Sequence, residues 1–245
     1  MWRAWFSFSA RTPRGASGAS RSSSTTGSPT SCCALRPPAD VGKPSQTQDR
    51  HEASMAELLI SPDQIYREVQ TAIADALQIS AEKVQLDISL ISDLAAESLD
   101  FIDINFRLEQ RFGVAMPRKY LLDHVEELFG EGTAIDGSGR LTEVAVTIWN
   151  ARLGSAGPRV HAGMPLDDVP TLVTPRTLVM IVEEILATCP DTCPTCGKTA
   201  WTVVEEGTIG CGECGSRAPL LTGDDVIRRW LEDFRARGGP MSSAS

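Results

Sequence analysis

The chain has 245 residues, 42% hydrophobic and 22% charged, which is enough for one ordinary domain, a small second one and tails. Its formal net charge of −9 is uneven, because residues 1–54 carry +4 and residues 55–245 carry −13. The acidic part matches basic protein surfaces better than phosphate backbones, which argues against strong nucleic-acid binding. No apolar run reaches the roughly 18 uncharged residues of a transmembrane segment.

Residues 1–54 are rich in Ser, Arg, Gly, Thr and Pro, with no acidic residue before Asp40. A segment of this composition cannot bury a core, so we expect it to be disordered. It is Arg- and Ser-rich like a transit peptide, but it shows no amphipathic helical period. We therefore favour the reading in which this segment is upstream sequence and Met55 is the true start.

The first predicted helix has Ser61 as its cap, Pro62 at the first helical position and Gln64 completing a capping box. Its apolar face is formed by residues that recur every four positions, namely Ile65, Val69, Ile73 and Leu77. A loop through Asp87 and Ser92 leads to the next helix.

The second predicted helix runs from Ser98 to about Phe112 and ends before Gly113. Its apolar residues form two adjacent stripes, one of Phe101, Ile104, Leu108 and Phe112 and one of Leu99, Ile102 and Phe106. Acidic residues lie among them at Asp100, Asp103 and Glu109. A helix in a small bundle needs one stripe for its core, so the second stripe suggests a ligand or partner. A helix buried on two sides would give the same periodicity.

Four more helices are predicted, at 118–129, 141–153, 175–187 and about 224–237. The helix at 175 opens with Thr174 and Pro175, again a cap followed by proline. A Gly/Pro-rich loop at 154–173 precedes it.

Two C-x-x-C pairs near the C-terminus each precede a glycine and enclose 14 residues: Cys193 with Cys196, and Cys211 with Cys214. Two residues between thiolates let one tight turn present both sulfurs to one ion. Four thiolates favour Zn²⁺ in a closed tetrahedral site, with a redox dithiol pair or an iron–sulfur site as alternatives. The pattern predicts a zinc ribbon with short strands at 201–204 and 208–209.

The other cysteines are Cys32, Cys33 and Cys189, an odd number that favours a reducing, cytoplasmic location over a disulfide framework. Cys189 has no partner at ligand spacing and is expected to be a bystander. The ribbon loop contains Glu205 and Glu206 but only Lys198 as a basic residue, so a structural or protein-docking role is expected.

The run DLAAESLD at 93–100, the mixed acidic and apolar helix after it, and the run FGVAMP at 112–117 resemble the acyl carrier protein family. The resemblance extends over roughly 58–188 and is strongest at 90–117. The sequence SLDFIDI, which begins at Ser98, resembles the corresponding sequence of the longer carriers that serve very-long-chain or hydroxylated acyl groups in lipid A synthesis.

The resemblance implies that Ser98 carries a 4′-phosphopantetheine arm whose thiol holds acyl groups as thioesters. It places Asp93 and Asp100 in the same site, with Asp100 orienting the metal and the transferase during modification. It implies two kinds of partner, a phosphopantetheinyl transferase and acyl-transfer or condensing enzymes with basic docking patches. The expected partner-binding or chamber-lining residues are Leu99, Ile102, Asp103 and Phe106.

Two positions depart from the family pattern, since Glu97 stands where Asp is usual and Ala95 where Gly is usual. Glu97 keeps the charge but moves it by one methylene group. Apart from the resemblance, Ser98 could be an ordinary helix cap, because serine is a preferred cap residue.

We therefore expect a carrier for fatty-acid, lipid or polyketide-type biosynthesis and not an enzyme. The histidines support no catalytic constellation, because His51 lies in the N-terminal segment and His124 and His161 lack a surrounding motif. The alternative is an interaction protein that kept the carrier fold, lost the arm and works through the ribbon.

The expected fold is mostly α: an acyl-carrier-like four-helix bundle with an inserted helix and loop, followed by a small β zinc ribbon and a final helix. The expected domain limits are 1–54 for the N-terminal extension, 58–188 for the carrier domain with its insertion at 131–173, 189–237 for the ribbon and last helix, and 238–245 for a disordered tail.

Overall fold

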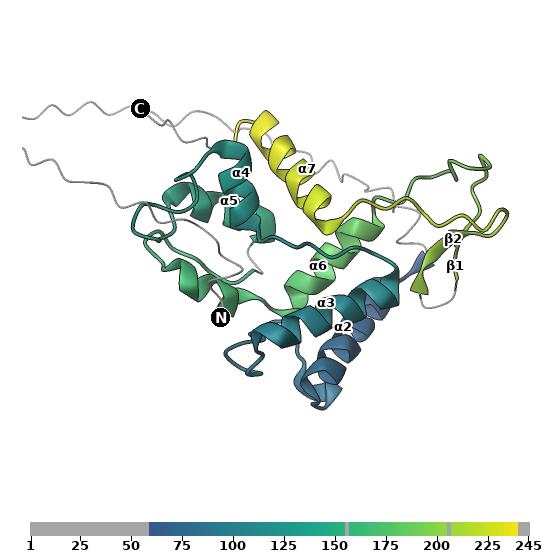
Figure 1. The fold of residues 1–245 in the computed structure, drawn as a ribbon, viewed down its shortest axis with the longest axis horizontal. Coiled ribbons are helices and arrows are strands. Elements are labelled where there is room, and N and C mark those ends of the chain that lie inside the picture. The colour runs from purple at the N-terminus through teal and green to yellow at the C-terminus, as the bar shows by residue number, and fades with distance from the viewer. Residues whose placement is uncertain (1–58, 155–156, 205–206, 240–245) are drawn as a thin grey trace, which may run out of the picture. The chain divides into compact units, whose positions relative to one another are not determined.

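The computed structural model describes residues 59–154, 157–204 and 207–239, which are mostly helical with one two-stranded antiparallel sheet (Figure 1). The elements are, in order, α2 (Pro62–Leu77), α3 (Ser98–Phe112), α4 (Leu121–Phe129), α5 (Glu143–Leu153), α6 (Pro175–Leu186), β1 (Trp201–Val203), β2 (Ile209–Cys211) and α7 (Gly223–Ala236). The predicted mostly α fold class with a small C-terminal ribbon is confirmed. The predicted N-terminal extension, 1–54, lies outside the described residues, as does the predicted tail, 238–245, apart from Gly238 and Gly239.

Local capping chemistry starts three of the helices where the sequence predicts. Ser61 Oγ accepts the Gln64 backbone N–H at 3.3 Å ahead of α2, and Thr174 Oγ1 accepts the Thr177 N–H at 3.4 Å ahead of α6. Thr222 Oγ1 likewise accepts the Asp225 N–H at 3.2 Å ahead of α7.

The start of α4 differs from the predicted residue 118, since the helix begins at Leu121. The backbone N–H groups of Arg118 and Lys119 donate instead to the carboxylate of Asp224, at 3.0 and 3.2 Å. Asp224 lies in the first turn of α7, so a contact with the far end of the chain fixes where α4 begins.

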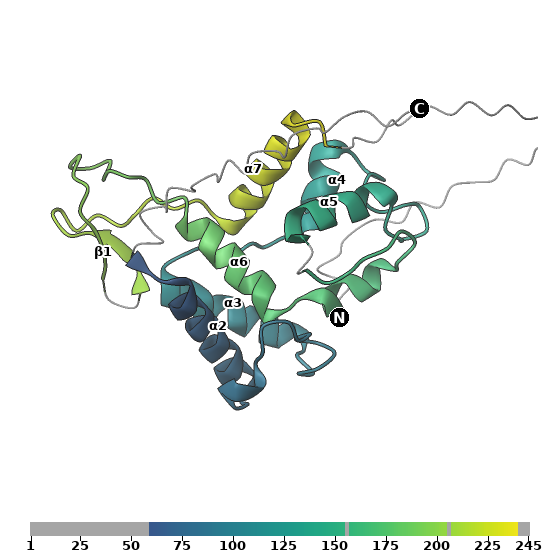
Figure 2. The ribbon, with the colours of Figure 1, turned by 180° about the vertical axis from the view of Figure 1, so that it is seen from behind.

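The helices pack in two groups that share α6, and both views of the ribbon show α6 between them (Figures 1 and 2). In the first group α2 packs against both α3 and α6, and in the second α4 packs against α5 and α7 while α6 packs against α7. The core of the first group is formed by fully buried aliphatic residues: Val69 and Ile73 of α2, Ile104 and Leu108 of α3, Val182 and Ile185 of α6.

The insertion at 131–173 is held by a buried carboxylate and by the loop between α2 and α3. Glu126 accepts the backbone N–H groups of Gly132, Ala134 and Ile135 at 2.6, 2.5 and 3.0 Å. The end of the insertion forms a 3₁₀ helix, Leu166–Leu172, inside the predicted loop at 154–173. Beside it, the Leu90 N–H donates to the Val173 carbonyl at 3.0 Å. None of the described helices combines the length and apolar character that a membrane span requires.

Candidate functional site

The N-terminus of α3 is capped by Glu97 in an extended conformation, and Ser98 is the first helical residue. The Glu97 N–H donates to Asp100 Oδ2 at 2.7 Å, and the Asp100 N–H donates to the Glu97 carbonyl at 3.0 Å. The alternative interpretation of Ser98 as the helix cap is therefore wrong. Asp100, which the sequence places in the site, has a local role in fixing this first turn.

Ser98 is partly buried. Its hydroxyl forms no hydrogen bond with any described residue. Backbone N–H groups in the first turn of a helix lack partners within the helix and carry the positive end of its dipole. A negatively charged group on Ser98 would be stabilised by about 0.3–1 kcal/mol there.

The loop before α3 is held in a specific shape by backbone hydrogen bonds. The Ala96 N–H donates to the Leu90 carbonyl at 2.9 Å, and the Ser89 N–H donates to Asp93 Oδ2 at 2.7 Å. Ala95 adopts a left-handed conformation with φ of 56°, which favours glycine. This conformation gives a physical reason for glycine at that position in the family pattern, and Asp93 supports the loop that leads to Ser98.

The second apolar stripe of α3 is exposed, so the helix is not buried on two sides. Leu99, Ile102 and Phe106 have exposed fractions of 76%, 49% and 57%. Ile104 and Leu108 of the other stripe are fully buried. The exposed stripe begins next to Ser98 and lies on the surface of the described structure.

The acidic residues of α3 are engaged to different degrees. Asp103 Oδ2 accepts a hydrogen bond from Arg107 Nε at 3.0 Å. The exposed fraction is 42% for the Asp103 side chain and 39% for that of Arg107. Glu109 is more enclosed, because it accepts the Met116 N–H and the Arg118 guanidinium, both at 2.9 Å. Of these two, Asp103 is the one open to a partner.

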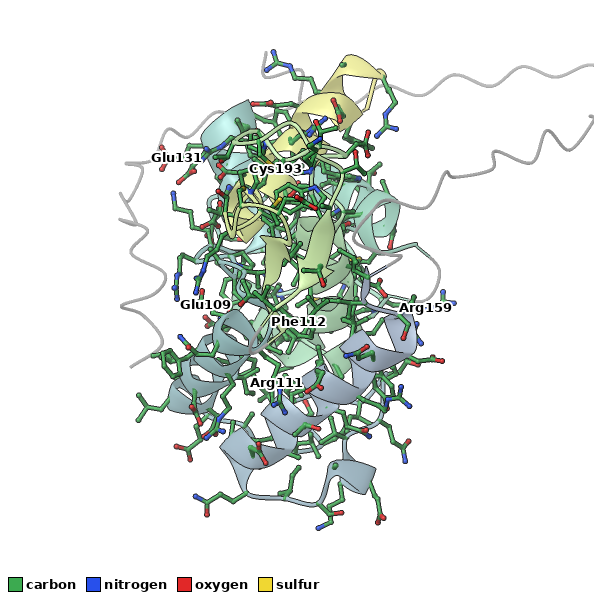
Figure 3. The ribbon with its side chains drawn as sticks, turned by 90° about the vertical axis from the view of Figure 1, so that its right-hand side faces the viewer. Glu109, Arg111, Phe112, Glu131, Arg159 and Cys193 are labelled. Atoms are coloured by element: carbon green, nitrogen blue, oxygen red, sulfur yellow. The ribbon has the colours of Figure 1, made fainter. Side chains whose placement is uncertain are left out.

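The four predicted metal ligands come together in one cluster, and Figure 3 labels Cys193 within it. The Sγ atoms of Cys193 and Cys214 are 3.6 Å apart, as are those of Cys196 and Cys211, and all four lie within 4.8 Å of one another. Sulfurs bound to one tetrahedral Zn²⁺ at about 2.3 Å are about 3.8 Å apart, whereas a disulfide requires about 2.05 Å. The donor set and its spacing therefore fit one tetrahedral metal ion.

The two halves of the cluster have the same local structure. The Gly197 N–H donates to the Cys193 carbonyl and the Gly215 N–H to the Cys211 carbonyl, both at 2.8 Å. Both glycines have a positive φ, 72° and 74°, which the tight turn after each C-x-x-C pair requires. The glycine that follows each pair in the sequence thus directs both sulfurs to the same side.

Without a cation, the pKa values of Cys214 and Cys196 are shifted in opposite directions. Hydrogen bonds from the side chain and backbone of Ser216 lower the pKa of Cys214 to about 6. The Lys198 N–H favours the thiolate of Cys196, but burial and hydrogen bonds with the other three sulfurs raise its pKa to about 12. Adjacent like charges resist a fully ionised cluster, and a divalent cation removes that repulsion.

The remaining candidate groups stay outside these sites. Cys189 is buried, and burial raises the pKa of its thiol, in keeping with a packing residue. His124 is fully buried with Nε2 3.0 Å from Asp224 Oδ1, and exposed His161 contacts the carbonyl of its neighbour Ala162. Sequence reasoning missed Glu97 as the cap and Asp224 as the anchor of the α3–α4 turn, and only the acidic start of α7 hinted at the latter.

Known proteins are similar to this chain in the first part of its described residues. The family model of the phosphopantetheine attachment site matches residues 67–126. The acyl carrier protein of Clostridium acetobutylicum is 38% identical over 53 residues, which is 22% of this chain and 69% of that protein. The acyl carrier protein of Treponema denticola is 38% identical over 55 residues, which is 22% of this chain and 70% of that protein. The acyl carrier protein of Campylobacter hominis is 32% identical over 54 residues, which is 22% of this chain and 68% of that protein. No solved structure matches the chain significantly.

Proposed function

The chain belongs to the acyl carrier protein family, and we propose that it holds acyl groups as thioesters on a phosphopantetheine arm attached to Ser98. Acyl carrier proteins are carriers and not catalysts, so the chain is not an enzyme. The observation that carries the proposal is the position of Ser98, which starts α3 within the matched region and whose hydroxyl bonds to no described residue.

The surroundings of Ser98 support a phosphodiester at its hydroxyl. The first turn of α3 places the positive end of the helix dipole beside Ser98, and Asp100 and Glu97 hold that turn in place. When attached, the arm supplies the thiol on which the acyl group is carried. The residues of this chain position the arm and present it to other proteins.

The exposed stripe of α3 supports a protein partner that docks beside the arm. Leu99 is adjacent to Ser98, and Ile102 and Phe106 follow on the same face, with Asp103 among them. A partner with a shallow apolar recess and a basic rim would match this face, and the charges would speed the encounter. We propose phosphopantetheinyl transferase and acyl-transfer or condensing enzymes as those partners, in the cytoplasm, for fatty-acid, lipid or polyketide-type synthesis.

Intact mass measurement tests the arm directly. The full chain is co-expressed with each of several phosphopantetheinyl transferases, because Glu97 alters the charge position next to Ser98. We expect one phosphopantetheine mass increment, its loss in Ser98→Ala, and its retention in Ser92→Ala, which removes an exposed hydroxyl from the preceding loop. No increment with any transferase would contradict the carrier site and favour an interaction module that has lost the arm.

We propose that the cysteine cluster of residues Cys193, Cys196, Cys211 and Cys214 binds one structural Zn²⁺. Support comes from the four-sulfur donor set, its tetrahedral spacing and the matching glycine turns. Metal analysis of protein purified without chelator should find one zinc per chain, unchanged in Cys189→Ser. Less than about half an equivalent of zinc per chain would contradict a closed zinc site. Bound iron together with visible absorbance would indicate an iron–sulfur site instead.

A further inference from the structure

The ribbon contacts the C-terminal end of α3 at unusually close range. A Cβ atom on Gly207 would lie 2.1 Å from the Arg111 carbonyl oxygen, and a Cβ on Gly113 would lie 2.7 Å from the Thr208 side chain. Both positions therefore require glycine at the interface between two separate parts of the chain. Figure 3 views the molecule from the ribbon side and labels Arg111 and Phe112 at this end of α3.

The segments that enter and leave the ribbon are also held by hydrogen bonds. The Trp201 indole N–H of β1 donates to the carbonyl of Pro190 in the entering segment at 2.6 Å. After the ribbon, the Leu221 N–H donates to Thr188 Oγ1 at 3.0 Å, just beyond α6. The ribbon is thus attached at its base as well as through the Gly207 loop.

The same chain segment continues into α7, which holds the turn after α3. The Gly223 N–H donates to the Ala115 carbonyl at 2.8 Å, and a Cβ on Gly223 would lie 2.4 Å from Pro117. Asp224 accepts the backbone N–H groups of Arg118 and Lys119. The turn at 113–119 is therefore held by contacts from Gly223 and Asp224, which follow the cysteine cluster in the sequence.

We propose that the metal-loaded ribbon acts as a clamp on the carrier domain, fixing the C-terminal end of α3 and the turn at 113–119. The proposal rests on zinc binding by the four cysteines. A ribbon of this size has too few residues for a core of its own, so its folding depends on the metal. Loss of the metal therefore frees the Gly207–Thr208 loop and removes its contacts with Arg111 and Gly113.

The clamp acts on one end of the helix only. The 15 residues of α3 rise by about 1.5 Å each, so Ser98 lies roughly 22 Å from the clamped end. The loop before Ser98 is held by other contacts, including the Asp87–Arg176 ion pair and the hydrogen bond from Leu90 to Val173. Metal loss should leave these contacts in place.

Amide hydrogen exchange of the full chain, with zinc and after chelation, tests the clamp. We expect exchange at 108–119 to become at least about tenfold faster without zinc, while exchange at 90–104 changes little. Gly207→Ala should give the same local acceleration with zinc present, because the added methyl group separates the loop from Arg111. The control is Gly139→Ala, which has a similar positive φ of 78° but no neighbour within 4 Å.

The outcomes separate the clamp from the metal site. If no zinc binds to the wild-type chain, the zinc site itself is contradicted. If zinc binds but its removal leaves amide exchange at 108–119 unchanged, only the clamp is overturned. The clamp is also overturned if zinc-bound Gly207→Ala shows the same exchange at 108–119 as the zinc-bound wild type. A lower zinc affinity in Gly207→Ala than in Gly139→Ala would support the clamp, since coupling between the two contacts is reciprocal.

Discussion

The two ends of α3 have different neighbours. At the Ser98 end, Leu99 is 76% exposed, and the serine hydroxyl forms no hydrogen bond with a described residue. At the Gly113 end, Phe112 is only 2% exposed, and the ribbon loop lies against the Arg111 carbonyl group. The exposed stripe therefore begins beside Ser98, whereas the ribbon contacts the opposite end of the same helix.

This contrast coincides with the limits of the family match. The match covers residues 67–126, which include all of α3, whereas the groups that cover its Gly113 end come from residues 207–224. The ribbon loop and the start of α7 thus contact the end of α3 remote from the proposed arm, whereas the end of the insertion contacts the loop before Ser98 through Leu90 and Val173.

The separation between the two ends of α3 is tested most strongly by replacing one buried cysteine of the cluster. Cys211→Ser should abolish zinc binding at stoichiometric metal, since structural zinc supplies about 10–16 kcal/mol of folding free energy in zinc-finger peptides. Because the two ends are separate, the rate of Ser98 modification should stay within about twofold. Metal analysis and intact mass kinetics measure both, with Cys189→Ser as control, and a joint loss would show that the ends are not separate.

A matched pair of truncations compares the buried and exposed stripes of α3. Leu108→Ala should lower the free energy of unfolding by about 2–5 kcal/mol, because Leu108 is fully buried. Phe106→Ala should change it by no more than about 0.5 kcal/mol, because that ring is 57% exposed. Urea unfolding measures both, and equal losses would mean that the exposed stripe is covered in solution.

A methyl group at the clamped end should also destabilise the chain. Gly113→Ala is expected to cost about 1–3 kcal/mol, because φ is 63° and the new Cβ meets Thr208. Thr208→Ala in the same chain should recover part of the loss by removing the two atoms at 2.7 Å. A double-mutant cycle by urea unfolding measures this coupling, and strictly additive effects would place Thr208 away from Gly113.

The smallest expected effect is a gain at the Ser98 end. Ala95→Gly removes the strain of a left-handed alanine, about 1–2 kcal/mol, and adds backbone entropy to the unfolded chain. The net result should be a stabilisation of up to about 1 kcal/mol, read from the thermal midpoint. Ala96→Gly changes the buried neighbour, which has an ordinary φ, and should lower the thermal midpoint. A shift of the midpoint in the same direction for both variants would contradict the left-handed conformation of Ala95.

Local chemistry made much of the fold predictable. Thr174 with Pro175 marks the start of α6, and the paired cysteines with their glycines mark the ribbon turns. Periodicity alone could not decide whether the second stripe of α3 was buried, because that depends on what packs beside it. The start of α4 was predicted three residues early for the same reason, since Asp224 lies about one hundred residues further along the chain.

The contacts of Asp224 have a consequence for how the protein is made. This side chain joins His124 and the Arg118 N–H across 100 and 106 residues of sequence. During synthesis, α2, α3 and the loop before Ser98 emerge long before Asp224 is added. We expect the nascent chain to form the start of α3 early and to leave its far end open until Asp224 has been synthesised.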